Sequence, residues 1–169
     1  MPEIQRRLAT ILATDCVGYS ALMVEDETAT LDGVKACRTI IETTINEYGG
    51  RVFNTAGDSV IAEFNSPVDC VNAAIDFQNL LFDRNKTNKN IPTMQFRVGI
   101  HLDDVIIEDG DIFGNGVNIA ARPEGVCDPG EILISENVHQ YISKKINLIS
   151  EHIGNKNLKN IDGEFPVFQ

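Results

Sequence analysis

The alternation of apolar and polar positions along the chain predicts an α+β domain. Residues 7–15, RLATILATD, alternate with the period of a strand, and residues 51–54 and 59–64 predict a hairpin closed by the turn TAGD. Between them, apolar residues at helical spacing over about 27–48 predict an amphipathic helix that ends at the glycines of YGG. A second helix begins at Pro67 and continues through Leu81, and the polar run 83–90 is expected to be a loop.

The later segments extend this order. Residues 95–102 predict a strand, and residues 104–110 predict a second strand that pairs with it. Residues 112–122, IFGNGVNIAAR, indicate a loop that enters a helix, and residues 131–142 indicate a strand followed by a short Ser-capped helix. One or two short strands are expected in the tail.

The resulting order, β-α-β-β-α-β with C-terminal additions, is that of the ferredoxin-like split βαβ fold. We expect one domain over residues 1–169, because neither a linker nor an internal repeat interrupts the chain. In this fold the first and third strands are antiparallel neighbours. The end of the first strand, at Asp15, should therefore lie beside the start of the third strand, at Asp58.

Composition narrows the choice of function. The 169 residues are 43% hydrophobic and carry a formal net charge of −11, which argues against a nucleic-acid groove or an anionic membrane surface as partner. The four cysteines have no CxxC spacing and the three histidines are scattered, so no zinc site is expected. With no signal peptide and no long apolar run, the pattern predicts a soluble cytoplasmic protein.

Two neighbouring carboxylates at strand ends repel each other unless a shared proton, a cationic group or metal ions hold them together. Either aspartate alone would more often be an Asx turn or a cap. As a pair without nearby His or Cys, Asp15 and Asp58 suit Mg²⁺ or Mn²⁺, with substrate phosphates as further ligands. Beside Asp15, the backbone N–H groups of Gly18, Tyr19 and Ser20 could hold phosphate oxygens. Together these features indicate phosphoryl or nucleotidyl transfer.

The ordered segments ILATDCVGYS, GGRVFNTAGDSVIAEF, FRVGIHLDDV, DIFGNGVNIAAR and LKN resemble the catalytic domain of class III adenylate and guanylate cyclases. The resemblance runs from about residue 7 to the end. It implies a nucleotidyl cyclase that converts a nucleoside triphosphate to a 3′,5′-cyclic monophosphate and pyrophosphate. It also implies two metal ions, held by Asp15, Asp58 and the backbone carbonyl of Cys16.

The same resemblance assigns further residues. Asn118 and Arg122, one helical turn apart, match the pair that stabilises the transition state, and Arg97 and Lys159 match positions that contact the triphosphate. Because the metal aspartates and the Asn–Arg pair act from opposite subunits in this family, a C2 homodimer is implied. Pro123 follows Arg122 where the family usually has leucine, and a proline there can redirect that helix.

Base selection is where the chain departs from its family. Adenylate cyclases carry lysine four residues before the second metal aspartate, and this chain has Asn54 there, whereas their aspartate is kept as Asp111. Neither the adenine nor the guanine pattern is complete. Asn54 and Asp111 together can serve cytosine or uracil, since an amide both donates and accepts.

This departure favours a pyrimidine substrate, CTP or UTP. Only a catalytic domain is recognisable, which resembles stand-alone cyclases of bacterial antiviral defence that make cyclic CMP or cyclic UMP for a separate effector. The alternatives are an adenylate cyclase that uses ATP despite Asn54, and a catalytically silent cyclase-like binding domain.

Overall fold

The computed structural model of the protein describes residues 5–87, 93–108, 111–113, 129–143, 158–161 and 167–168. In chain order the elements are β1 (Gln5–Cys16), α1 (Tyr19–Glu25), α2 (Glu27–Glu47), β2 (Arg51–Ala56), β3 (Ser59–Phe64), α3 (Pro67–Thr87), β4 (Phe96–Glu108), β5 (Asp111–Phe113), β6 (Ile132–Ile134), α5 (Glu136–Ser143), β7 (Leu158–Ile161) and β8 (Val167–Phe168).

The strands form one sheet with the order β2-β3-β1-β4-β6-β7-β8, and β5 pairs with β4. The sub-order β2-β3-β1-β4 is antiparallel throughout and is that of the predicted ferredoxin-like core, so the predicted fold class is confirmed. The predicted additions are β6 and β7, which pair in parallel, and β8 at the edge.

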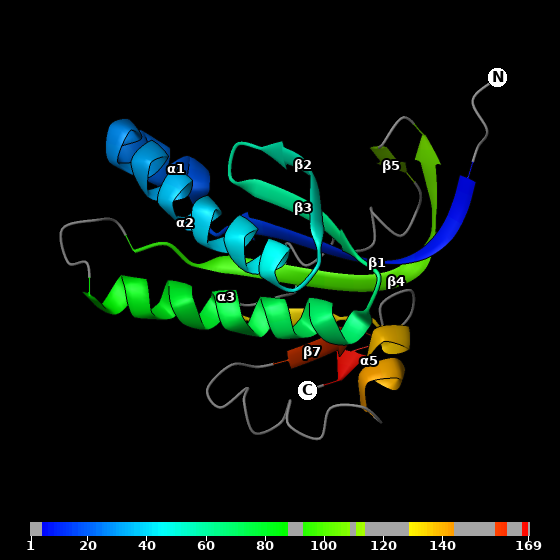
Figure 1. The fold of residues 1–169 in the computed structure, drawn as a ribbon. Helices are drawn as coiled ribbons and strands as arrows, with labels where there is room; N and C mark the ends of the chain where they lie inside the picture. Colours follow the sequence, from blue (N-terminus) through cyan, green and yellow to red (C-terminus); the bar gives the residue numbers. More distant parts are fainter. Residues whose placement is uncertain are drawn as a thin grey trace.

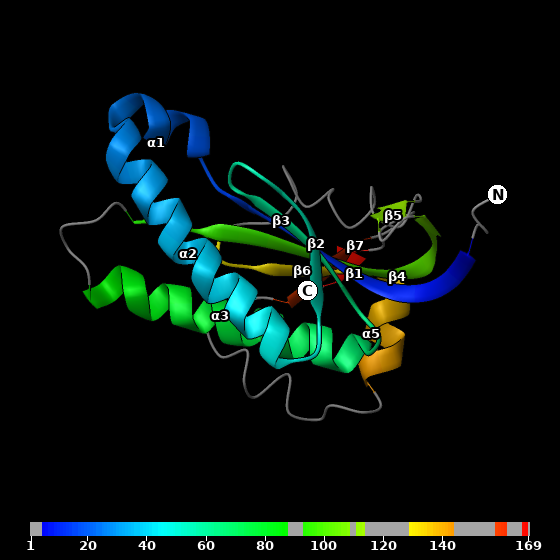
Figure 2. The same cartoon turned by 45° about the horizontal axis from the view of Figure 1, so that its top comes forward.

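The helices α2, α3 and α5 lie on one face of this sheet (Figure 1 and Figure 2). The main core fills the space between them and the sheet, and its large side chains are fully buried, among them Ile41, Phe64, Phe77, Phe96 and Ile100. This burial supplies the main driving force for folding. Two cysteines, Cys37 and Cys70, are also fully buried here.

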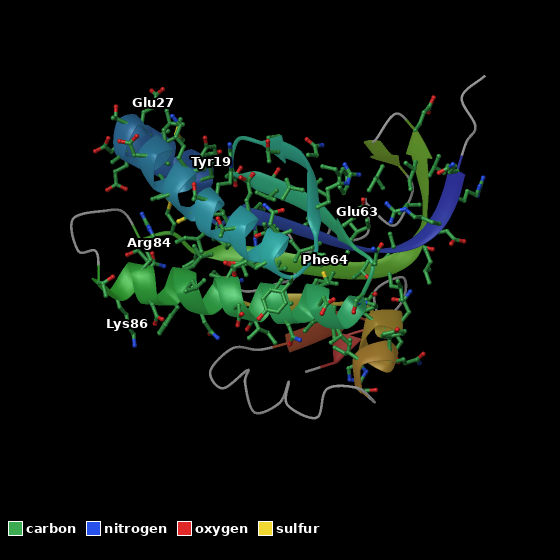
Figure 3. All side chains as sticks on the ribbon, in the orientation of Figure 1. Tyr19, Glu27, Glu63, Phe64, Arg84 and Lys86 are labelled. Atoms are coloured by element: carbon green, nitrogen blue, oxygen red, sulfur yellow. The ribbon has the colours of Figure 1, made fainter. Side chains whose placement is uncertain are left out.

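The opposite face of the sheet, here called the helix-free face, has a smaller apolar cluster. Its buried members are Ala9, Ile11, Ala13, Val105 and Ile112, and Phe53, Ile61 and Ile107 pack against them. Neighbouring strand residues point to opposite faces. Phe64 therefore belongs to the main core, and Glu63 lies on the helix-free face (Figure 3).

Two sequence-based predictions are corrected. The polar segment 83–87 continues α3 rather than forming a loop. Asn85 explains this, because its side chain bonds both the N–H and the C=O of Met94 and so holds the segment before β4. Residues 104–108 continue β4 and pair with β1, instead of folding back on residues 96–102. Residues 19–25, for which no element was predicted, form the helix α1.

In the part of the chain that the structure describes, no helix is both long and apolar enough to cross a membrane.

Candidate active site

Asp15 lies at the end of β1, directly opposite Arg97 on β4. The two side chains form a forked ion pair, in which Arg97 Nε lies 3.2 Å from Asp15 Oδ1 and Arg97 Nη2 lies 3.1 Å from Asp15 Oδ2. The Asp15 side chain is 31% exposed and the Arg97 side chain 15%. Both carboxylate oxygens thus meet one cation at a site that solvent still reaches.

Asp58 lies in the turn between β2 and β3, next to the end of β1 as the predicted topology requires. Its Oδ2 accepts a hydrogen bond of 2.8 Å from the backbone N–H of Cys16. Gly57 has φ +56°, a left-handed conformation that favours glycine, and its carbonyl accepts a bond of 3.1 Å from Arg38 Nη1. The turn therefore holds the second carboxylate beside the first.

Cys16 presents its backbone to this site and its side chain to the core. Cys16 as a whole is 3% exposed. Burial, and after it the negative charge of Asp58, raises the pKa of the Cys16 thiol to about 12. The sulfur is therefore a neutral thiol at physiological pH. Any contribution of Cys16 to a metal site is limited to its backbone carbonyl, as the family resemblance implies.

The pair fits a hard divalent cation. Asp15 and Asp58 offer only carboxylate oxygens, the ligands that Mg²⁺ and Mn²⁺ prefer. The guanidinium of Arg97 already shows that a cation is accommodated at Asp15. Among the described residues no group of three or more His, Cys, Asp or Glu side chains could hold a metal ion. An ion at this pair would therefore take further oxygens from backbone, water or substrate.

The segment after Asp15 was predicted to hold phosphate. Gly18 has φ +68° and stands at the N-cap of α1, and Tyr19 and Ser20 form the first positions of this helix. A side chain on Gly57 would come within 3.8 Å of Tyr19 Cε1, so the ring lies close to the turn that holds Asp58. The segment is thus adjacent to the carboxylate pair, and phosphate binding there stays a prediction.

Asn54 is positioned by an irregularity in β2. The register shifts between Val52 and Asn54, and Asn54 pairs with Ile61. Phe53 packs, like Ile61, against the cluster on the helix-free face. Two consecutive residues thus oppose one partner in a β-bulge, which directs Asn54 to the face that carries Asp15. In a regular strand Phe53 and Asn54 would point to opposite faces.

The segment of Asp111 approaches the same face. The backbone of Asp111 pairs with Glu108, and β5 returns on the side of the sheet away from α3 (Figure 1 and Figure 2). Ile112 belongs to the apolar cluster against which Phe53 packs. The structure therefore brings β5, which begins at Asp111, toward the bulge that carries Asn54.

The remaining predicted residues are placed in part or not at all. The backbone of Lys159 lies in β7, paired with Leu133, which in turn pairs with Gly99 of β4. Lys159 thus shares a transverse row of the sheet with Gly99, two residues from Arg97. Asn118 and Arg122, together with Pro123, lie outside the described residues.

Sequence reasoning missed two features of this site. The bidentate pairing of Arg97 with Asp15 follows from the β1–β4 register, which no local pattern reveals. The bulge at Phe53 also gave no signal, because the segment contains no glycine at that position. Both depend on which residues face each other across strands.

Comparison with known proteins agrees with this geometry. Residues 3–165 match the family described as adenylate and guanylate cyclase catalytic domain. The chain is 39% identical over 161 residues to putative adenylate cyclase 3 of Rhizobium meliloti (strain 1021), covering 95% of this chain and 27% of the relative. It is 31% identical to an adenylate cyclase of Streptomyces coelicolor, covering 78% of this chain and 33% of that protein. The chain thus spans about a quarter to a third of the length of these relatives.

Solved structures of cyclases also match this chain. A crystal structure of an adenylate/guanylate cyclase/hydrolase from Silicibacter pomeroyi matches with a TM-score of 0.75 and 38% identity, covering 85% of this chain and 83% of that one. The adenylyl cyclase CyaB from P. aeruginosa also matches with a TM-score of 0.75, at 24% identity, covering 85% of this chain and 84% of that one.

Proposed function

This chain belongs to the family of adenylate and guanylate cyclase catalytic domains, and we propose that it is a lyase-type nucleotidyl cyclase whose substrate is ATP. The observation that carries the catalytic part is the placement of Asp15 and Asp58: Asp15 pairs with Arg97, and Asp58 bonds the N–H of the next residue, Cys16. The choice of ATP is supported by relatives that are named adenylate cyclase and match most of this chain.

In the proposed reaction the 3′-hydroxyl oxygen of ribose attacks the α-phosphorus. The bond between this oxygen and the α-phosphorus forms, the bond to the β-bridging oxygen breaks, and pyrophosphate leaves with the electron pair. The proton of the hydroxyl passes to solvent. Asp15 and Asp58, with the carbonyl of Cys16, would hold two Mg²⁺ or Mn²⁺ ions, which when bound acidify the hydroxyl and offset phosphate charge.

The other side chains would bind and orient the nucleotide. Arg97 and Lys159 would contact the triphosphate, and the backbone N–H groups of residues 18–20 would donate hydrogen bonds to its oxygens. Asn118 and Arg122 would come from the partner protomer and stabilise the charge that develops at the α-phosphate. We therefore propose a homodimer with two equivalent sites at its interface.

A pyrimidine substrate is the second candidate, and Asn54 favours it. Asn54 is exposed on the β2 bulge, where adenylate cyclases have lysine. Its amide is shorter than lysine and can both donate and accept a hydrogen bond. With Asp111 approaching from β5, this arrangement could select cytosine or uracil. Synthesis of cyclic CMP or cyclic UMP for a separate antiviral effector remains a prediction from the sequence.

The substrate is tested by incubating the purified protein with Mn²⁺ and each of ATP, GTP, CTP and UTP, and separating the products by chromatography and mass. We expect cyclic AMP as the main product. Asn54→Lys should raise kcat/KM for ATP, because the longer lysine side chain brings a donor to the position that adenylate cyclases use for adenine. A cyclic pyrimidine nucleotide as main product would replace the first candidate by the second, and no product from any nucleotide would favour the silent binding domain.

The shared site is tested by mixing two inactive variants, Asp58→Asn and Arg122→Ala. If the two half-sites belong to different protomers, half of the dimers are mixed and each has one intact site. The mixture should then recover about a quarter of the wild-type activity. A mixture that stays inactive, although mixed dimers are detected by mass spectrometry, would contradict the proposal.

A further inference from the structure

The ion pair between Asp15 and Arg97 occupies both oxygens of the carboxylate that is proposed to bind metal. Arg97 presents Nε and Nη2 to Oδ1 and Oδ2 at 3.2 and 3.1 Å, a forked geometry that a lysine cannot reproduce. The two residues are direct neighbours across β1 and β4, so neither backbone has to move to form the pair.

The local charge explains why this pair forms. Asp58 lies against the end of β1 through its bond with the N–H of Cys16, the residue that follows Asp15. Two carboxylates at neighbouring positions destabilise each other unless a cation is present. The Arg97 side chain, 15% exposed and inserted on this side of the sheet, supplies that cation.

A divalent ion at Asp15 changes this balance. The ion and the guanidinium would be two cations at one carboxylate, and they repel each other at that distance. Arg97 then gains by moving to a negatively charged group nearby. The triphosphate of a nucleotide bound at the same site is such a group.

We propose that Arg97 exchanges partners during binding: it holds Asp15 when the site has no divalent ion, and it moves to the nucleotide triphosphate when the ions bind. This inference rests on the proposed function. Divalent ions alone must break the pair and leave Arg97 without a counterion. Ions and nucleotide together give Arg97 a new one, so each should strengthen the binding of the other.

The exchange predicts opposite effects of one substitution on two ligands. In Arg97→Gln, nucleotide-free protein should bind Mn²⁺ roughly threefold to tenfold more tightly, because no ion pair has to be broken. The same variant should bind 3′-deoxy-ATP, which lacks the attacking hydroxyl, more weakly in the presence of Mn²⁺. Isothermal titration with Mn²⁺ alone, and then with Mn²⁺ and 3′-deoxy-ATP, measures both.

Three further variants separate the causes. Arg38→Gln removes the same charge from an arginine that contacts Gly57, next to Asp58, and should change Mn²⁺ affinity less than twofold. Arg97→Lys keeps the charge without the forked geometry and should lie between wild type and Arg97→Gln. It also carries the test if Arg97→Gln does not fold. Asp15→Asn should remove the tight Mn²⁺ site, which identifies the measured ion.

The inference is overturned if Arg97→Gln binds Mn²⁺ no more tightly than wild type, or if Arg38→Gln tightens Mn²⁺ binding as much. A different result is expected if the proposed function itself is wrong. In that case wild-type protein shows no Mn²⁺ site that depends on Asp15 and forms no cyclic nucleotide.

Discussion

Two clusters of arginine and carboxylate lie on the same helix-free face of the sheet, and they differ in the sign of their charge. Near the β2–β3 turn, one arginine, Arg97, pairs with Asp15, and a second carboxylate, Asp58, bonds the N–H of the next residue, Cys16. Farther along β3, two arginines, Arg7 and Arg51, converge on the single carboxylate of Glu63. The first cluster has an excess of negative charge, and the second an excess of positive charge.

The carboxylates of the two clusters also differ in burial. The Glu63 side chain is 8% exposed, whereas that of Asp15 is 31% exposed. Arg51 donates from Nε to Glu63 Oε1 at 2.8 Å, and Arg7 donates to Oε2, so each carboxylate oxygen has its own guanidinium. The Glu63 cluster is thus complete within the protein. The Asp15 cluster has more carboxylates than arginines, so further cations would balance its charge. This is expected of a binding site and not of an ion pair that only stabilises the fold.

The largest expected effect comes from removing one carboxylate of the negative cluster. Asp58→Asn keeps an acceptor for the Cys16 N–H but removes a proposed metal ligand, and should lower turnover by about 1000-fold or more. The melting temperature should stay the same or rise, because repulsion with Asp15 is relieved. Turnover with Mn²⁺ and thermal unfolding measure the two.

Asp32→Asn, at an exposed position of α2, is the matched control and should change neither quantity. A large loss of stability in Asp58→Asn would show that this carboxylate is structural, and the contrast between the clusters would disappear.

Glu63→Gln should have the opposite outcome, a loss of stability with little loss of turnover. It leaves Arg7 and Arg51 next to each other without their shared counterion. Since both arginines are more than a third exposed, solvent reduces the cost to about 2 kcal/mol of unfolding free energy. Urea unfolding measures it. Turnover per folded molecule that falls as far as in Asp58→Asn would contradict the structural role.

Local sequence patterns predicted the fold and the meeting of Asp15 and Asp58. They did not predict contacts that depend on how distant strands pair. Helical spacing over α2 and alternation over β1 are local, and the topology then required Asp15 and Asp58 to meet. Glu63 and Arg7 are far apart along the chain, and their pairing depends on strand register and on long, flexible side chains.

Polar residues also misled the prediction over residues 83–87. These residues form the last turn of α3 because Asn85 bonds the backbone of Met94, a contact that hydropathy does not reveal. The nucleobase that the site selects is likewise not predicted by local sequence patterns. Asn54 was recognised as a departure, but the bulge that directs it appeared only with the β2–β3 register.

A smaller effect tests whether the positive cluster really has one arginine more than it needs. Arg7→Gln and Arg51→Gln should each cost less than about 1 kcal/mol, because Glu63 keeps one guanidinium in either variant. The double variant leaves a buried carboxylate with neither, and should cost about 1 kcal/mol more than the sum. Urea unfolding of the four proteins gives this coupling. Strict additivity would mean that Glu63 does not depend on either arginine.

The smallest expected effect concerns an arginine on the other face of the sheet. Arg84, on α3, is 9% exposed, and its Nη1 is 3.4 Å from Asn85 Oδ1, while its Nη2 has no hydrogen-bond partner (Figure 3). Among the described residues no carboxylate forms an ion pair with it. Its position in the last turn of α3 is favourable for a cation, which offsets part of the desolvation cost.

Arg84→Met keeps much of the volume and removes the buried charge, so the variant should be as stable as wild type or more stable by up to about 1 kcal/mol. This is opposite in sign to the effect expected of Glu63→Gln, although each removes one buried charge. The difference follows because Glu63 is matched by two cations and Arg84 by no described anion. A marked loss of stability on urea unfolding of Arg84→Met would mean that this guanidinium has a stabilising partner, and that counting charges does not predict which cluster is structural.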